Sequence, residues 1–326
     1  MHYLKRHHYN NLIYLVFLGL LVSQSLPSWA ASNYQLSAEA IADGEFDPPV
    51  WYYREKQQKL ELEEAQALYS QNAYRRLPPG FNAGLNQSPH WFKVLLEIDQ
   101  VYDAIATPIL YLNIADPLLD NISIYHQLNG ELIATSNMGD TFPFFDREFV
   151  ANSFVLPLRV NPNETHTIWI RVETTSTMHM PVKIWTPKRF FEHQIFELFT
   201  FGILVGLISI MAFYNFVIGA RVRSLDYFFY VGVLVSAISH RLLITGTGFQ
   251  YLWPDSPEIN QTIRPIIDSS VAIFSVLFTQ YFLDTRNKSP LLHRCLNAWI
   301  VIACATAVPL TFKINSFENH FRYCAL

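Results

Sequence analysis

The stretch Phe196–Ala220, FELFTFGILVGLISIMAFYNFVIGA, decides how the rest of the chain is organised. It holds about 25 residues, and its one charged residue is Glu197 at the start. The hydrocarbon core of a bilayer is about 30 Å thick, so a helix needs about 20 apolar residues to cross it. The stretch therefore predicts a membrane-spanning helix.

Three further apolar segments follow this first one, at 227–244, 266–283 and 296–312. Each contains roughly 17 to 18 residues, which is near the lower limit for crossing a bilayer. The sequence therefore predicts about four spans between residues 196 and 312. The last stretch, 313–326 (KINSFENHFRYCAL), is an atypical tail that matches neither a span nor a domain.

The charges of the short loops predict the orientation of these spans. The basic loop residues are Arg221 and Arg223 after the first span, and Arg286, Lys288 and Arg294 after the third. The loop 245–263 between them contains two acids and no Lys or Arg. Because basic loops mark the cytoplasmic side, we expect the first and third loops inside and the second loop outside.

Residues 1–30 have the composition of a signal peptide. Lys5 and Arg6 precede the apolar run Leu12–Val22, and Ser28-Trp29-Ala30 provides small residues at a cleavage site. The alternative is an uncleaved anchor. Both readings export the segment that follows, so we expect a multi-pass membrane protein with residues 31–195 on the outside.

Composition limits the possible functions of the exported part. The formal net charge of the chain is −4, and a nucleic-acid-binding protein would need a basic face. All three cysteines, Cys295, Cys304 and Cys324, lie at or beyond the third loop of the membrane part, and the exported part has none. The exported part can therefore have neither a disulfide framework nor a Cys-x-x-Cys metal site.

The exported part divides into a lead-in and a strand-rich region. Within the lead-in, 31–90, the charged run Arg54–Leu68 predicts a short helix with a solvated face. From Trp91 onward, short runs of strand-forming residues alternate with turn pairs. The predicted strands are 91–98, 108–113, 121–126, 131–135, 149–158, 167–173 and 182–185.

These strands predict an all-β domain over residues 91–190. Asn129-Gly130 between two of them fits the tight turn of an antiparallel hairpin. Seven short strands without a crossover helix favour an antiparallel sandwich or jelly roll. The predicted fold class is thus an antiparallel β-sandwich followed by an α-helical transmembrane bundle.

Several short motifs of the chain resemble those of a known family. The chain is similar, over roughly residues 50–310, to the bacterial seven-transmembrane receptors with diverse intracellular signalling modules (7TMR-DISM). The landmarks of the exported domain are Phe81-Asn82-Ala83-Gly84, Trp91-Phe92, Ile122–Tyr125, Asn129-Gly130, Gly139-Asp140, Pro143-Phe144, Arg147, Trp169–Val172 and Trp185. Those of the membrane part are Gly202-Ile203-Leu204, Tyr214-Asn215, Leu225-Asp226-Tyr227, Tyr230, Gly246–Gly248, Tyr251-Leu252-Trp253-Pro254 and Phe282-Leu283.

The resemblance implies a sensory receptor. Its exported domain, of the type called 7TMR-DISM extracellular 2, would bind a small ligand, with carbohydrates as the expected class. The helices would relay binding to a cytoplasmic signalling module such as a cyclase or a histidine kinase. Because this chain carries about four predicted spans and no such module, we expect a truncated receptor that needs a separate cytoplasmic signalling protein.

Sequence motifs of enzymes are missing from the chain. It contains no G-x-S-x-G, no phosphate-binding Gly-rich loop and no H-E-x-x-H. We therefore predict a protein that is not an enzyme and uses no cofactor or metal. The alternatives are a membrane-tethered carbohydrate-active enzyme, a non-signalling ligand-binding subunit of the membrane, and a transporter or structural membrane protein.

Three exported residues are candidates for ligand binding: Tyr125, Asp140 and Arg147. An Arg fork can bind a carboxylate or sugar hydroxyls, and Tyr125, at the end of its strand, could stack on a sugar ring. The structural alternative is that Arg147 pairs with a loop acid, such as Asp146 or Asp140, and fixes the loop to the sandwich. Trp169 and Trp185 could also stack, but core positions are favoured for both.

His240 and Arg241 lie in the second predicted span, towards its outer end. Charged residues in a membrane usually have a partner, and Asp268 falls on the same side of the membrane. We predict that Arg241 pairs with Asp268; the alternative is an Arg that reaches out to the interface. Tyr251 and Trp253 are predicted interface anchors.

Overall fold

The computed structural model describes residues 35–36, 44–55, 59–85, 88–98 and 109–305 of the 326-residue chain. The predicted signal peptide, the tail 313–326 and the final part of the fourth predicted span lie outside the described residues. The described residues all belong to one compact unit, Tyr34–Leu326.

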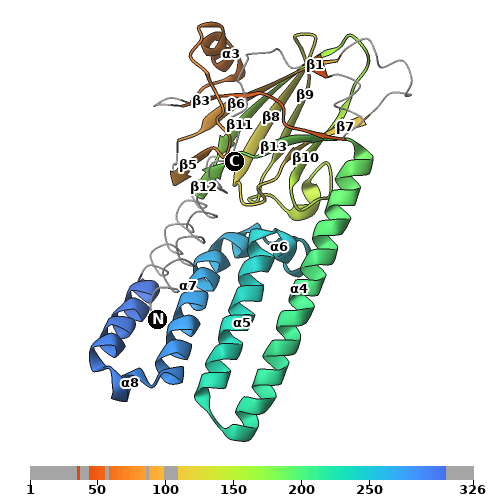
Figure 1. Cartoon of the computed structure of the whole chain (residues 1–326). Helices are drawn as coiled ribbons and strands as arrows, with labels where there is room; N and C mark the ends of the chain where they lie inside the picture. Colours follow the sequence, from red (N-terminus) through yellow and green to blue (C-terminus); the bar gives the residue numbers. More distant parts are fainter. Residues whose placement is uncertain (1–34, 37–43, 56–58, 86–87, 99–108, 306–326) are drawn as a thin grey trace, which may run out of the picture. The chain divides into compact units, whose positions relative to one another are not determined.

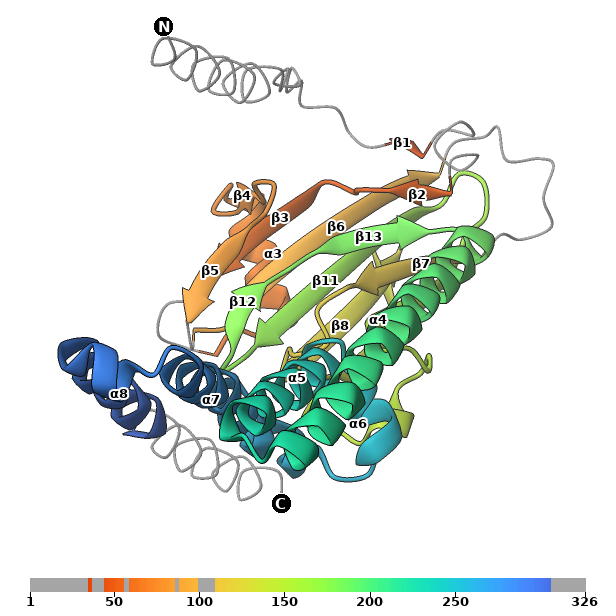
Figure 2. The same ribbon diagram turned by 60° about the horizontal axis from the view of Figure 1, so that its bottom comes forward.

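The exported region is built from two β-sheets and a two-stranded ribbon (Figures 1 and 2). The larger sheet has the order β4 (Arg75–Arg76), β3 (Val50–Arg54), β6 (His90–Ile98), β11 (Thr165–Glu173), β8 (Asn121–Leu128) and β9 (Glu131–Met138), with β1 (Gln35–Leu36) beside β6. The smaller sheet has the order β10 (Phe154–Arg159), β7 (Ile109–Ile114), β13 (Val182–Trp185) and β2 (Glu45–Phe46). The ribbon pairs β12 (Thr177–His179) with β5 (Asn82–Leu85).

One hydrophobic core joins the two sheets. Alternate residues of a strand face the same side, and Phe92 and Val94 of β6 turn towards Leu110 and Leu112 of β7 in a single buried cluster. All pairings are antiparallel except the short one between β1 and β6. The predicted fold class, an antiparallel sandwich followed by apolar helices, is confirmed.

We expected the strand-rich region to begin at residue 91, but it begins well before that residue. β3 pairs with β6 inside the larger sheet, and α3 spans Leu62–Ser70 instead of Arg54–Leu68. The reason is the alternation in β3, where Tyr52 packs on the main core while Trp51 and Tyr53 join the aromatic cluster beneath α3. Burial on both faces outweighs the helix propensity of the charged run that follows.

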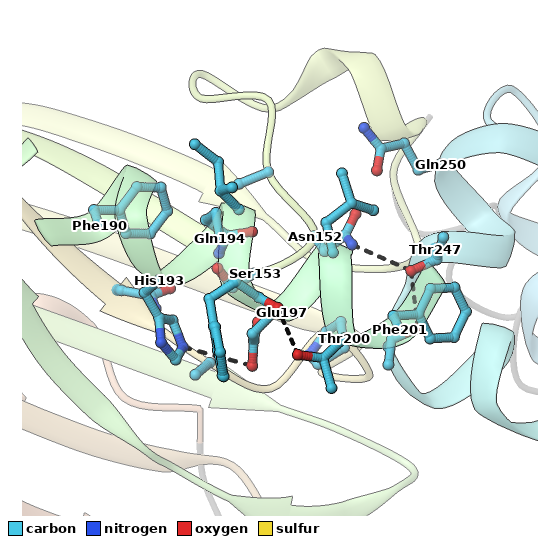
Figure 3. A pocket seen from close by; sticks show the side chains of 18 of the residues that line it. Asn152, Ser153, Phe190, His193, Gln194, Glu197, Thr200, Phe201, Thr247 and Gln250 are labelled. Atoms are coloured by element: carbon cyan, nitrogen blue, oxygen red, sulfur yellow. Dashed lines mark hydrogen bonds and ion pairs between the residues drawn. The ribbon is translucent and has the colours of Figure 1, made fainter. Parts of the chain in front are cut away.

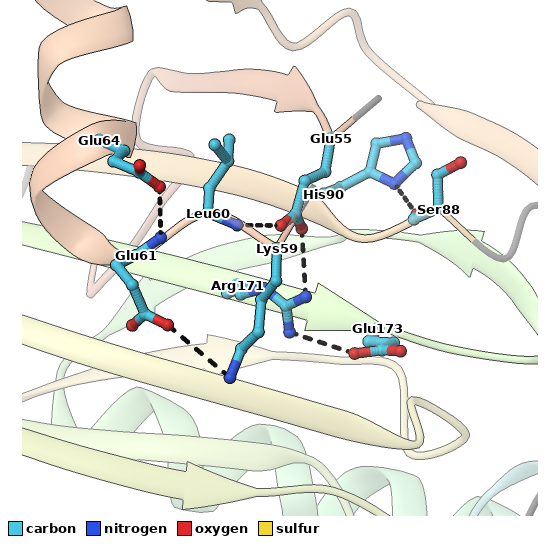
Figure 4. A network of polar contacts seen from close by, with 9 residues as sticks. All are labelled: Glu55, Lys59, Leu60, Glu61, Glu64, Ser88, His90, Arg171 and Glu173. Carbon is cyan, nitrogen blue, oxygen red and sulfur yellow. Dashed lines mark hydrogen bonds and ion pairs between the residues drawn. The ribbon is translucent and has the colours of Figure 1, made fainter. Parts of the chain in front are cut away.

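Glu55 fixes the end of this early strand to the sheet (Figure 4). Its side chain is 3% exposed, and its carboxylate lies 3.2 Å from the guanidinium of Arg171 on β11. The other carboxylate oxygen accepts a hydrogen bond from the backbone N–H of Leu60. Because a buried carboxylate requires such partners, Glu55 connects Leu60, just before α3, to Arg171 of the larger sheet.

The membrane part consists of helices that follow the sandwich in the sequence. α4 spans Pro187–Val222, α5 Leu225–Ile244, α6 Thr247–Leu252, α7 Pro257–Phe282 and α8 Thr285–Lys288. α4, α5 and α7 are long and apolar enough to cross a membrane, and Pro290–Ala305 is a shorter apolar helix. α4 starts before the predicted Phe196, because Pro187 suits a first helical turn.

A pair of histidines is buried between β8 and β11. His126 Nε2 lies 2.9 Å from His166 Nδ1, and the two rings are stacked. His166 Nε2 also lies 3.3 Å from the carboxylate of Glu164. Burial, and secondarily the neighbouring His166, lower the pKa of His126 to about 4. Burial also lowers the pKa of His166, against the opposing effect of Glu164.

This pair predicts a loss of stability in acid. A base whose pKa is lower in the folded state stabilises the fold above its unfolded pKa, near 6.5. We expect the contribution of His126, on the order of 2 kcal/mol, to disappear as the pH falls from 6.5 to 4. As the pH falls across this range, the unfolding temperature of the wild type should decrease relative to that of His126→Phe. A constant difference would contradict the assignment.

Candidate functional site at the junction of sandwich and helices

The loop between β9 and β10, residues 139–153, contacts the helices directly. The backbone N–H of Phe144 donates to the carbonyl of Pro254 at 2.9 Å, just beyond α6. Asn152 Nδ2 donates to Thr247 Oγ1 on α6 at 3.3 Å. The loop 245–263, predicted to face outside, therefore lies on the same side of the helices as the sandwich.

Arg147 is a buried positively charged group of this loop. Its side chain is 8% exposed, and its guanidinium carbon lies 4.3 Å from the ring centre of Phe144 and 4.5 Å from that of Phe154. Phe249 of α6 adds a third ring at 5.9 Å. Burial lowers the pKa of Arg147 to about 10, and the charge of Asp140 opposes this shift. An Arg held between rings is stabilised by dispersion and by the ring quadrupoles.

The hydrogen bonds of Arg147 return to its own loop. Its Nη1 donates to the carbonyls of Ala151 at 2.8 Å and Asn152 at 3.2 Å. The acid whose charge acts on Arg147 is Asp140. These contacts hold the loop together through its own carbonyl groups, whereas an ion pair of Arg147 with Asp140 or Asp146 stays a prediction.

Asp140 links the loop to α7. It is 3% exposed, and its Oδ2 accepts a hydrogen bond from Asn260 Nδ2 at 3.3 Å. Asn260 also accepts a hydrogen bond from the indole of Trp253 at 3.4 Å. Asp140 and Arg147, both proposed from the sequence as ligand-binding residues, thus lie together at the junction.

Tyr125 lies apart from this pair, on the face of the larger sheet that α3 covers. It is half-buried and stacks on Trp91 with ring centres 5.8 Å apart. Burial raises the pKa of its hydroxyl. Trp169 and Trp185 are 3% and 2% exposed, so the prediction that they belong to the core is confirmed. The structure does not bring the three candidate residues into one site.

Arg264 of α7 makes a second contact with the sandwich. Its Nη1 donates to Ser176 Oγ at 2.7 Å. The preceding segment is held by the buried Asp120, whose Oδ2 accepts from the backbone N–H of Thr175 at 2.7 Å. Burial raises the pKa of Asp120, and the charge of Arg264 is among the effects that oppose the rise. Sequence reasoning missed Asn260 and Arg264, because nothing local marks them as partners of the sandwich.

The predicted pairing of Arg241 with Asp268 is wrong. His240 Nδ1 lies 2.7 Å from Asp268 Oδ1, while Arg241 is exposed on another side of α5. Neighbouring residues of a helix point about 100° apart, so only one of the two can face α7. The topological part of the prediction, a polar pair between these two spans, holds with His240 as the partner.

A double-mutant cycle tests this pair. We expect His240→Ala and Asp268→Ala to share a coupling energy of about 0.5 to 1 kcal/mol, since both are partly exposed and polar pairs between membrane helices are weak. Arg241→Ala should add independently to Asp268→Ala. Unfolding of the full chain in detergent gives the free energies, and equal coupling for Arg241 would contradict the assignment.

The fold and the junction define a class of protein: a membrane protein with a β-domain outside, attached to apolar helices. The family model described as 7TMR-DISM extracellular 2 matches residues 47–186, and the model described as 7TM diverse intracellular signalling matches residues 197–325. The chain belongs to the 7TMR-DISM family. The predicted membership is confirmed, and the second match includes the stretch 313–325 that we treated as a tail.

Other comparisons add little. No curated protein matches the chain. Among solved structures, exo-beta-1,3-galactanase from Phanerochaete chrysosporium with beta-1,3-galactotriose is 9% identical, with a TM-score of 0.20 over 43% of this chain and 28% of that one. The same enzyme with galactose is 12% identical, with a TM-score of 0.18 over 35% and 31%. The chain thus spans about a third or less of these proteins, and likenesses this weak carry no argument.

Proposed function

We propose that this chain is the sensing part of a receptor in the bacterial inner membrane, with residues 31–195 in the periplasm. The sandwich, of jelly-roll type, binds a small ligand, for which carbohydrates are our candidate class. The helices pass the bound state to a cytoplasmic signalling protein. The protein acts as a receptor and not as an enzyme.

The observation that supports this proposal is the polar junction between sandwich and helices. Asp140 binds Asn260 of α7, and Arg264 of the same helix binds Ser176. One helix therefore contacts the sandwich at two points, Asp140 and Ser176, and these two points are far apart in the sequence of the sandwich. A displacement of the segment that carries Asp140, or of the one that carries Ser176, changes the contacts of α7. A ligand that binds one position of these segments more tightly would therefore also shift the helices.

The experiment uses the full chain in lipid nanodiscs and a panel of neutral mono- and oligosaccharides. We expect a member of the panel to raise the unfolding temperature, because a ligand stabilises the state that it binds. Hydrogen exchange would then be measured at the turn between α4 and α5, on the far side of the membrane. Relay predicts changed exchange at this turn on binding.

Asn260→Leu separates the two halves of the proposal. It removes the contact with Asp140 without touching the sandwich itself, so binding should persist while the response at the distant turn weakens. Ser123→Ala on β8 is the matched control and should respond as the wild type. If no sugar binds, carbohydrate is the wrong ligand class; if a sugar binds without any change at the turn, the relay is refuted.

A further inference from the structure

A cavity of about 670 Å³ lies between the sandwich, the start of α4 and the outer ends of α5 and α6 (Figure 3). This volume falls within the usual range of small-molecule sites. The cavity is separate from the face that carries Tyr125, and the mechanism proposed above does not use it. We call the part of the lining that Asn113, Asn152 and Ser153 of the sandwich form its polar end. The helices contribute apolar residues, among them Phe196, Leu204 and Tyr251, beside polar ones such as Glu197, Thr200 and Arg241.

Three of the residues that line this cavity each have a buried polar atom without a partner among the residues that the structure describes: Asn113 Oδ1, Asn152 Oδ1 and Ser153 Oγ. Asn113 is 4% exposed and Ser153 is 7% exposed. Buried polar atoms nearly always have a hydrogen-bond partner. Two of these atoms are carbonyl oxygens, which accept only, and the third is a hydroxyl. They call for a ligand that donates hydrogen bonds.

The positions of these atoms follow from strand alternation. Leu112 and Ile114 of β7 point into the core, so Asn113 between them points outward, towards α4. In the same way Phe154 points into the core and Ser153 outward. The amide of Asn152 donates to Thr247, which leaves its carbonyl oxygen for another partner.

The opposite side of the cavity continues into the surface that faces lipid. Phe196, Leu204 and Tyr251 line it, and they are 68%, 43% and 67% exposed. α4 has 36 residues, about 54 Å at 1.5 Å per residue, whereas a bilayer core is about 30 Å thick. The first turns of α4 therefore project out of the membrane, and the cavity lies where they enter it.

The charged groups of the lining favour a neutral ligand. Arg241 lies on α5, but Glu197 of α4 also lines the cavity, and its carboxylate is 3.5 Å from His193 Nε2. A negative headgroup would meet Glu197 and the two carbonyl oxygens, and a positive one would meet Arg241. A headgroup with hydroxyl donors satisfies the polar end without either conflict.

We propose that this cavity binds an amphiphile with a neutral, hydroxyl-bearing headgroup and an apolar chain, taken from the membrane leaflet on the sandwich side. Two headgroup hydroxyls donate to the carbonyl oxygens of Asn113 and Asn152, the Ser153 hydroxyl forms a hydrogen bond with a headgroup oxygen, and the chain lies along Phe196 and Leu204. Binding here requires neither a sugar on the sandwich nor relay to the cytoplasm, so it stands or falls apart from the proposed function.

The test is photolabelling of the full chain in phosphatidylcholine nanodiscs. The probe is a long-chain 1-monoacylglycerol with a diazirine in its acyl chain, and the comparison probe is the free fatty acid with the same chain. We expect the monoacylglycerol to label the segment 196–204 preferentially. Loss of one hydrogen bond lowers affinity about fivefold, so Asn113→Leu and Ser153→Ala should each lower subsaturating labelling by about that factor.

Stability distinguishes ligand binding from a structural role. Because Asn113 Oδ1 and Ser153 Oγ lack partners, neither substitution should lower the unfolding temperature of the chain without probe. Ser123→Ala, outside the cavity, should label as the wild type. Equal labelling by the fatty acid, or labelling that neither Asn113→Leu nor Ser153→Ala reduces, would overturn the proposal. If Asn113→Leu unfolds the chain, Ser153→Ala alone decides.

Discussion

Replacing Gly139 with alanine is expected to prevent the sandwich from folding. A Cβ atom at this position would lie 2.0 Å from the backbone oxygen of Asp120 and 2.7 Å from its carbonyl carbon, far inside contact distance. Gly139 also has φ +155°, which L-residues rarely adopt. Both features make the position specific for glycine.

The neighbouring backbone cannot move away to relieve this clash. The N–H of Asp140 donates to the carbonyl of Leu119 at 2.9 Å, and Thr141 Oγ1 donates to the Asp120 oxygen itself at 2.7 Å. Asp120 is further held by Thr175. Relief would break several of these hydrogen bonds, so we expect a loss of more than about 4 kcal/mol, in the extreme tail for single substitutions.

Limited proteolysis and thermal unfolding of the full chain in nanodiscs measure this loss. The matched control is Gly130→Ala in the β8–β9 turn, where φ is +91° and nothing lies within 4 Å of the added Cβ. There only backbone strain acts, about 1 kcal/mol. Similar stability for the two variants would contradict our conclusion that Gly139 lies too close to Asp120 to accept a side chain.

Replacing Arg147 with methionine is expected to give the second-largest loss, about 3 kcal/mol. Methionine can still pack between Phe144 and Phe154, but the carbonyls of Ala151 and Asn152 lose their donor and Asp140 loses its neighbouring charge. Each buried acceptor without a partner costs about 1–3 kcal/mol. The loop 139–153 should therefore loosen from α6.

Chemical unfolding gives the stability of this variant, and hydrogen exchange of residues 139–153 reports on the loop. Arg189→Met is a suitable control, because Arg189 is 52% exposed and its contact with Glu192, at 3.8 Å, is a surface pair. Such pairs contribute little. Unchanged exchange in the loop of Arg147→Met would contradict the role that we assign to the guanidinium.

Local patterns were sufficient to predict most strands between residues 91 and 185, although not β12, and the three long apolar helices. Alternation and turn pairs report on strands, and length and apolarity report on spans. Val50–Arg54 was missed because the charged run after it dominates its surroundings. What makes β3 a strand is its place beside β6 and the pairing of Glu55 with Arg171, a residue far along the chain.

The candidate site could also be predicted only in part, because some of its residues have partners that are distant in the sequence. Asp140 and Arg147 could be chosen from the sequence because charged residues in an aromatic loop are unusual. Asn260 and Arg264 could not, since their partners Asp140 and Ser176 are distant in sequence. The choice of Arg241 over His240 failed for a related reason. Depth in the membrane is nearly equal for the two, and only helix packing decides which of them faces Asp268.

The direct passage from β13 into α4 has a mechanical consequence. A single residue, Thr186, separates the sheet from the helix, and its N–H donates to the carbonyl of Gly44 beside β2 at 2.9 Å. No flexible linker can absorb a change of angle there, so the helix acts as a lever arm attached to the sheet. Over a length of about 54 Å, a tilt of about 5° would move its far end by about 5 Å, roughly one helical turn.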